Sequence, residues 1–73
     1  MQLTIKGAAS AELPLRVLGL LAQHGVQVES AQIALDGEHY DVAISAVPLG
    51  CEREALIVEK LRSMVLVRAA SAA

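Results

Sequence analysis

Apolar and polar residues alternate along residues 2–6, which predicts a half-buried strand. A loop of small residues follows at positions 7–10. Apolar residues then recur at steps of three and four, which predicts a helix that starts between Ser10 and Pro14 and ends at Gly25. The apolar stripe of this helix comprises Leu13, Val17, Leu20, Leu21 and His24.

A second strand is predicted over residues 26–35, where the apolar alternation changes phase. Such a change requires a bulge, which we place near residues 29–30. The Asp-Gly pair at 36–37 predicts a hairpin turn into a third strand over residues 39–47. The inner face of that third strand comprises Tyr40, Val42, Ile44 and Ala46.

Helical spacing returns in the last third of the chain and predicts a second helix over residues 51–64. Its expected stripe comprises Ile57, Val58, Leu61, Met64 and Val65. A final strand is predicted over residues 65–70, with Val65, Val67 and Ala69 inward. The small residues that follow are expected to fray.

The predicted order is therefore β-α-β-β-α-β within one domain, residues 1–73. Two right-handed βαβ units joined by a hairpin predict an α+β, ferredoxin-like sandwich. Its four antiparallel strands form one sheet, and both helices cover one face. The crossovers place the first and third strands in the middle, so the second strand is expected at an edge.

Composition narrows the function classes. Apolar residues make up 55% of the chain, more than one small core is expected to hide, and this favours a dimer or a partner subunit. The net charge of −2 disfavours nucleic acid, because the phosphate backbone requires a basic surface. The longest apolar run, residues 17–22, is too short to span a membrane. No signal peptide is visible, so we expect a cytoplasmic protein.

The candidate chemistry is sparse. His24 and His39 lie in different elements without ligands at metal spacing, so we expect no metal site. Cys51, the single cysteine, has no histidine placed to activate it. Glu29 and Asp41 are the carboxylates expected within the sheet, and nothing indicates a deep cleft around them. We therefore expect a protein that is not an enzyme and holds no cofactor.

Residues 16–30, RVLGLLAQHGVQVES, resemble the signature of ACT domains, and those of acetolactate (acetohydroxyacid) synthase regulatory small subunits most closely. That family carries an Arg-Val-x-Gly-Leu-Phe helix, a glycine and an Asn-Ile-Glu-Ser strand. Residues 60–67, KLRSMVLV, are similar to a second stretch of the same family. Within the helix, Gly19 is expected to allow close approach of a neighbour.

The resemblance implies pairing of two copies, so that two four-stranded sheets become one. The edge strand implied for this pairing comprises Val26, Val28, Ser30, Gln32 and Ala34. It also implies an amino-acid effector site between the loop after the first strand and the start of the partner's second strand. The corresponding residues here are Ala9, Glu12, Leu13, Gln27 and Val28. This chain departs from the family where Ala9 and Glu12 replace an Asn and a Gly, which removes an amide and adds a repulsive charge.

The resemblance thus implies a non-catalytic regulatory or activating subunit in branched-chain amino-acid biosynthesis. Such a subunit forms a homodimer and binds the large catalytic subunit, which holds the thiamine diphosphate, flavin and magnesium. One alternative is a free-standing ACT dimer that senses an amino acid, for which a branched-chain one is the first choice. Another is a dimerisation module whose ligand site has been lost.

Overall fold

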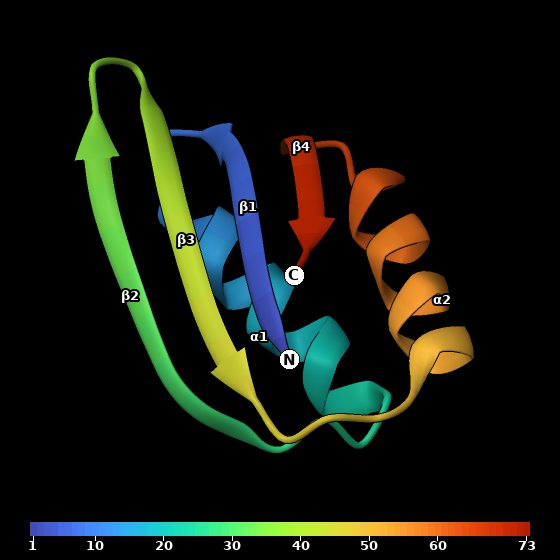
Figure 1. The fold of residues 1–73 in the computed structure, drawn as a ribbon. Coiled ribbons are helices and arrows are strands. Elements are labelled where there is room, and N and C mark those ends of the chain that lie inside the picture. Colours follow the sequence, from blue (N-terminus) through green and yellow to red (C-terminus); the bar gives the residue numbers. More distant parts are fainter.

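The computed structural model describes all residues, 1–73, and has the element order expected from the sequence (Figure 1). The strands and helices are β1 (Gln2–Ala8), α1 (Glu12–Gln23), β2 (Val28–Asp36), β3 (His39–Ala46), α2 (Cys51–Arg62) and β4 (Val67–Ala72). The strands form one antiparallel sheet in the order β2-β3-β1-β4. The ferredoxin-like fold and the edge position of β2 are therefore confirmed.

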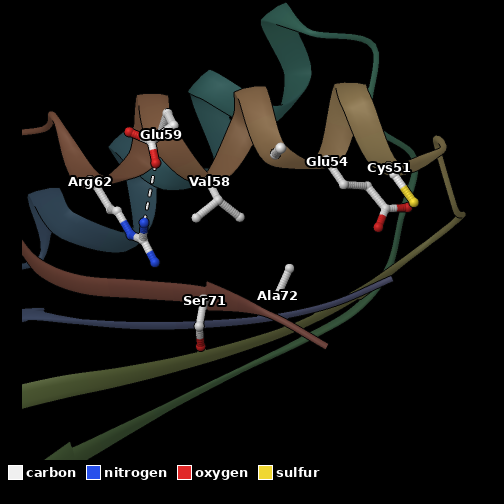
Figure 2. A pocket seen from close by; sticks show the side chains of 8 residues that line it. Cys51, Glu54, Val58, Glu59, Arg62, Ser71 and Ala72 are labelled. Carbon is white, nitrogen blue, oxygen red and sulfur yellow. Dashed lines mark hydrogen bonds and ion pairs between the residues drawn. The ribbon is translucent and has the colours of Figure 1, made fainter.

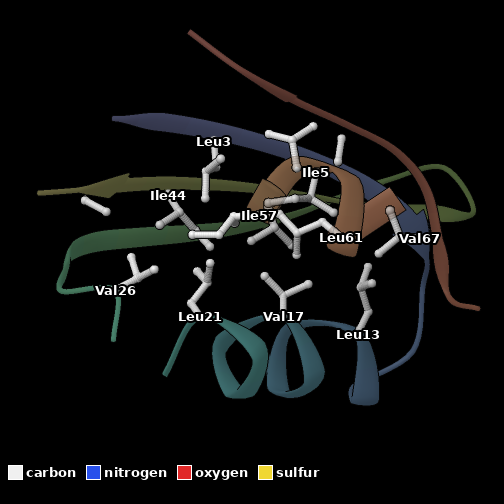
Figure 3. Close-up of a cluster of buried hydrophobic side chains, with 14 residues drawn as sticks. Leu3, Ile5, Leu13, Val17, Leu21, Val26, Ile44, Ile57, Leu61 and Val67 are labelled. Carbon is white, nitrogen blue, oxygen red and sulfur yellow. The ribbon is translucent and has the colours of Figure 1, made fainter. Parts of the chain in front are cut away.

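The core is a single aliphatic layer between the sheet and the helices (Figure 3). It contains 14 residues, and no polar or charged residue is buried. β1, β3 and both helices supply most of it, whereas every residue of β2 is exposed. Neither helix is long and apolar enough to cross a membrane.

The hairpin confirms the predicted bulge, moves the turn from residues 36–37 to residues 37–38, and corrects the start of the second strand. The register between β2 and β3 shifts between Val28 and Ser30, which is the predicted bulge. The turn residues are Gly37 and Glu38, and Gly37 adopts a φ of +62° that favours glycine. The strand begins at Val28 and not at Val26, because Val26 turns into the core and is 8% exposed.

The helix ends are held by local hydrogen bonds. Ser10 Oγ accepts from the backbone N–H of Glu12 at 3.2 Å, and Gly25, with a φ of +69°, follows the end of α1 as predicted. At the start of α2, the Glu54 carboxylate reaches back to accept from the Leu49 N–H at 3.0 Å. The arrangement resembles a capping box without its hydroxyl residue.

The last strand lies further along the chain than predicted. α2 ends at Arg62, and Val65 is 99% exposed in the turn that follows, so it belongs neither to the helix stripe nor to the strand. The inward residues of β4 are Val67 and Ala70. The spacing of three arises because the register skips one residue of β4 opposite β1. As a result, the side chain of Ala69 lies on the open face of the sheet and not on the helix side.

The tail does not fray, contrary to expectation. β4 extends to Ala72, which lies opposite Leu3 of β1. Ala73 donates to the Gln2 carbonyl at 2.9 Å and accepts from the Gln2 N–H at 3.3 Å. Backbone pairing to β1 thus compensates for side chains too small to predict a strand.

Two glycines occupy opposite environments. A Cβ on Gly7 would lie 2.3 Å from the Leu66 carbonyl oxygen and 2.9 Å from Leu13 Cδ2, so the absence of a side chain lets β4 enter beside β1. Nothing lies within 4 Å of a Cβ on Gly19. Gly19 therefore does not serve close packing within one protomer, contrary to expectation.

We expect Gly7→Ala to lower the free energy of unfolding by about 2 kcal/mol or more, because backbone must move to admit the methyl group. Gly19→Ala is the matched control and should raise that free energy by about 0.5–1 kcal/mol through helix propensity. Urea unfolding followed by circular dichroism measures both. Equal effects of the two substitutions would contradict the packing described at Gly7.

Candidate functional site

The outer edge of β2 carries unpaired backbone groups, and the hydrogen-bond pattern of the sheet identifies them. Met1 and Ala46 exchange two backbone bonds of 2.9 Å, so Ala46 faces β1. Because facing directions alternate along a strand, every second residue of β3 from Ser45 backwards faces β2. Their partners on β2 are Ser30, Gln32, Ala34 and Asp36. The residues between them direct N–H and C=O groups outward, and these are Ala31, Ile33 and Leu35.

The side chains of the same residues border an apolar groove. Ile33 and Leu35 lie opposite Val42 and Tyr40, on the helix side of the sheet, and are 51% and 65% exposed. The groove has a volume of about 540 Å³ between β2 and α1. Its lining comprises Ala11, Pro14, Leu15, Leu18, Ile33, Leu35 and Tyr40.

Exposed apolar side chains gather at this groove. Eight large hydrophobic residues of the chain are exposed, and five of them lie on α1 or β2. Four of the five, Leu15, Leu18, Ile33 and Leu35, line the groove, and the fifth, Val28, lies at the far end of β2. A contiguous apolar patch beside an unpaired strand edge is typical of a protein interface. We call this surface the α1/β2 edge.

A second hollow, of about 420 Å³, lies between α2 and β4 (Figure 2). It is more polar, and its charged side chains have partners within the chain. Glu54 accepts from Leu49 N–H, and Arg62 contacts both Glu59, at 3.2 Å, and the Ala70 carbonyl oxygen, at 3.0 Å. These charged side chains therefore already have hydrogen-bond or ionic partners within the chain.

The loop-side effector candidates differ in accessibility. Ala9 is exposed between β1 and α1. Glu12 is exposed and forms an ion pair of 3.3 Å with Arg16, so its charge is partly balanced within the helix. Leu13 is a core residue with 0% exposure. Its side chain has no surface to offer a ligand, which removes Leu13 from the candidate site.

The strand-side candidates lie at the other end of the sheet. Gln27 is exposed, and its carbonyl accepts from the Val47 N–H at 3.0 Å. Val28 begins β2 opposite Ala46, whereas β1 ends at Ala8 opposite His39, beside the hairpin turn. The two groups are thus separated by about the length of β2, roughly 25 Å. One protomer does not bring the predicted effector residues together.

Three of the predicted pairing residues, Ser30, Gln32 and Ala34, lie on β2 but direct their backbone groups toward β3 and not toward the free edge. Val28, Ser30, Gln32 and Ala34 belong to β2, whereas Val26 lies in the core. The backbone groups available for a new partner belong instead to Ala31, Ile33 and Leu35. The turn sets this alternation, because the residues that flank a two-residue loop bond to each other. A loop at the predicted residues 36–37 would make Leu35 face β3, whereas the loop observed at residues 37–38 makes Asp36 pair with His39, so the shift of one residue reverses the parity.

The remaining candidates form no cluster. No group of three or more His, Cys, Asp and Glu side chains could hold a metal ion. The His24 carbonyl accepts from Arg53 Nη2 at 2.9 Å, and the ring of His39 contacts Arg68. Cys51 is a free, exposed thiol. Glu29 accepts from Ser45 Oγ at 3.5 Å on the open sheet face.

Comparisons with known proteins identify the fold. The chain superposes on the ACT domain of GTP pyrophosphokinase from Chlorobium tepidum with a TM-score of 0.82, 10% identity, and coverage of 96% of this chain and 91% of that one. The C-terminal domain of MgtC from Mycobacterium tuberculosis matches with a TM-score of 0.76, 12% identity, and 96% and 80% coverage.

A third structure, formyltetrahydrofolate deformylase from Burkholderia mallei, matches with a TM-score of 0.58 and 24% identity. That match covers 84% of this chain and 20% of the deformylase chain. No protein-family model matches the sequence, and no curated protein is similar to it. The chain therefore has an ACT-like fold, established by backbone geometry at low sequence identity.

Two neighbouring leucines of α1 distinguish core from open surface. Leu13→Ala should lower the free energy of unfolding by about 2–5 kcal/mol, because it leaves a cavity in the core. Leu15 is 69% exposed, so Leu15→Ala should change it by at most about 0.5 kcal/mol in dilute protein. Urea unfolding at several protein concentrations tests this contrast. A large cost for Leu15→Ala at every dilution would show that the α1/β2 edge is not open.

Proposed function

We propose that this chain is a non-catalytic regulatory subunit that pairs with a second copy through the α1/β2 edge, and that the dimer binds and activates the large catalytic subunit of acetolactate synthase. The main support for the pairing is that two features occur together on β2. The residues with outward-facing backbone groups also have exposed apolar side chains. The resemblance of residues 16–30 and 60–67 to acetolactate synthase small subunits supports the choice of partner.

One partner strand would satisfy both requirements at once. A second β2 running antiparallel would bond to the free N–H and C=O groups of Ala31, Ile33 and Leu35. The side chains of the second copy would then cover the groove beside α1. The interface is self-complementary under two-fold symmetry, so the association closes instead of continuing through β2.

The same symmetry would complete the effector site. Antiparallel pairing places the start of one β2 near the end of the other, and that end lies beside the loop between β1 and α1. Gln27 and Val28 of one copy would approach Ala9 and Glu12 of its mate. A small amino acid bound at this seam would contact both copies, and its binding would therefore be coupled to pairing and to the partner's state.

In this role the chain catalyses no step itself. The distribution of polar groups supports such a role, since the buried side chains are all aliphatic and the charged ones lie at the surface. The regulatory effect follows from linkage: a subunit that binds one conformation of the catalytic subunit more tightly shifts its population toward that conformation.

The pairing is tested with Ile33→Lys, which places a charge in the groove and next to the free edge. We expect the unmodified chain to sediment as a dimer and Ile33→Lys to sediment as a single chain. Val65→Lys is the matched control, because Val65 is 99% exposed in a turn away from the α1/β2 edge. Sedimentation velocity over a concentration series measures all three. A dimeric Ile33→Lys variant would exclude pairing through β2.

The partner is tested by mixing the chain with purified acetolactate synthase catalytic subunit, supplied with thiamine diphosphate, flavin and magnesium. We expect the two proteins to elute together and acetolactate formation to rise several-fold. Ile33→Lys should reduce the activation if the dimer is the active form, whereas Val65→Lys should not. Unchanged activity without co-elution would reject this partner.

The free-standing sensor makes a different prediction in the same preparation. If the chain is dimeric and has no effect on the catalytic subunit, titration calorimetry with valine, leucine and isoleucine becomes the deciding measurement. Saturable binding that is lost in Ile33→Lys would support a sensor at the dimer seam. Dimerisation without binding of any amino acid would leave a pairing module.

A further inference from the structure

The sheet has a second edge, β4, and its backbone groups can be identified in the same way as those of β2. Gln2 and Ala73 exchange two backbone hydrogen bonds, so Ala73 faces β1. By alternation, Ser71 and Ala69 also face β1, whereas Ala72 and Ala70 direct their N–H and C=O groups outward. β4 thus presents free backbone groups as β2 does.

One of these groups has a partner. Arg62, in the last turn of α2, donates from Nε to the Ala70 carbonyl oxygen at 3.0 Å. The guanidinium is also held by Glu59, whose carboxylate accepts from Nη1 at 3.2 Å. Figure 2 shows Arg62 and Glu59 joined on α2, with the Arg62 side chain extending toward β4. A charged side chain therefore occupies the outer edge of this strand.

The two edges differ in ways that bear on strand pairing. β4 has six residues and β2 has nine. No side chain of the protein bonds to the outward groups of Ala31, Ile33 or Leu35. A strand that paired with β4 would have to displace the Arg62 guanidinium from the Ala70 carbonyl and from the space beside it. Charged side chains at edges are a known obstacle to such pairing.

We propose that Arg62 closes the β4 edge against strand pairing, so that association through the sheet is confined to β2 and stops at two copies. Without this closure, a dimer paired through β2 would expose a β4 edge at each end and could extend into open chains of protomers. The limit of two copies rests on the proposed pairing through β2, whereas the closure of β4 can be tested without it.

The test is Arg62→Ala, which removes the donor while retaining a strong helix former in α2. We expect the weight-average mass in sedimentation velocity to rise at least two-fold above that of the unmodified chain as concentration increases. Arg16→Ala is the matched control, since it removes an arginine paired to a glutamate on α1, away from β4. Arg62→Lys, which keeps a cationic donor, should restore much of the original behaviour.

The two proposals fail in distinguishable ways. In the Ile33→Lys background, Arg62→Ala should convert a single chain into a dimer joined through β4. If the unmodified chain proves to be monomeric, pairing through β2 fails, yet Arg62→Ala should still raise the mass. A folded Arg62→Ala variant with unchanged mass at all concentrations overturns the closure. An equal rise in Arg16→Ala also overturns it, because the effect would then follow from charge.

Circular dichroism establishes that each variant is folded before its mass is interpreted. If Arg62→Ala unfolds, Arg62→Met takes its place, because it keeps a long side chain and a strong helix former in the last turn of α2 without a hydrogen-bond donor. The same criteria apply to it: a raised mass supports the closure, and an unchanged mass rejects it.

Discussion

The sheet of this protein is wider than the helix layer that covers it. This mismatch in width explains the exposed second strand and the apolar surface beside it. Two helices of 12 residues bury aliphatic side chains from β1, β3 and β4. They do not cover β2, all of whose residues remain exposed. Because the interior is one continuous aliphatic layer, apolar residues that extend beyond it have no other place to be buried. The α1/β2 edge is the result.

The two edges of the sheet show opposite solutions to the same problem. Unpaired N–H and C=O groups invite association, and a domain with two open edges risks uncontrolled assembly. At β4, Arg62 places a guanidinium over the outward carbonyl of Ala70. At β2, the outward backbone groups stand beside apolar side chains. The proposed pairing through β2 and the proposed closure of β4 both rest on this difference between the two edges.

Some elements were predictable because a single local rule governs them. The bulge in β2 followed from the phase change near Ser30, and the end of α1 followed from Gly25. The sequence misplaces the last strand because its side chains are small and because the residues of β1 that pair with it are 60 to 69 positions away in the chain. The effector residues rest on the resemblance alone, whereas the helical spacing places Leu13 in the apolar stripe of α1 and thereby indicates its burial.

The order of elements, the antiparallel sheet and the aliphatic faces of β3 and α1 were determined by the sequence alone, since period-two and period-3.6 patterns report directly on burial. Only the tertiary structure decided which residues of β2 face outward and that Arg62 meets the edge of β4. It also decided that Gly7, and not Gly19, is the glycine required by close packing. These features depend on contacts between segments that are distant in the sequence, and a local sequence pattern does not show which distant segments will touch.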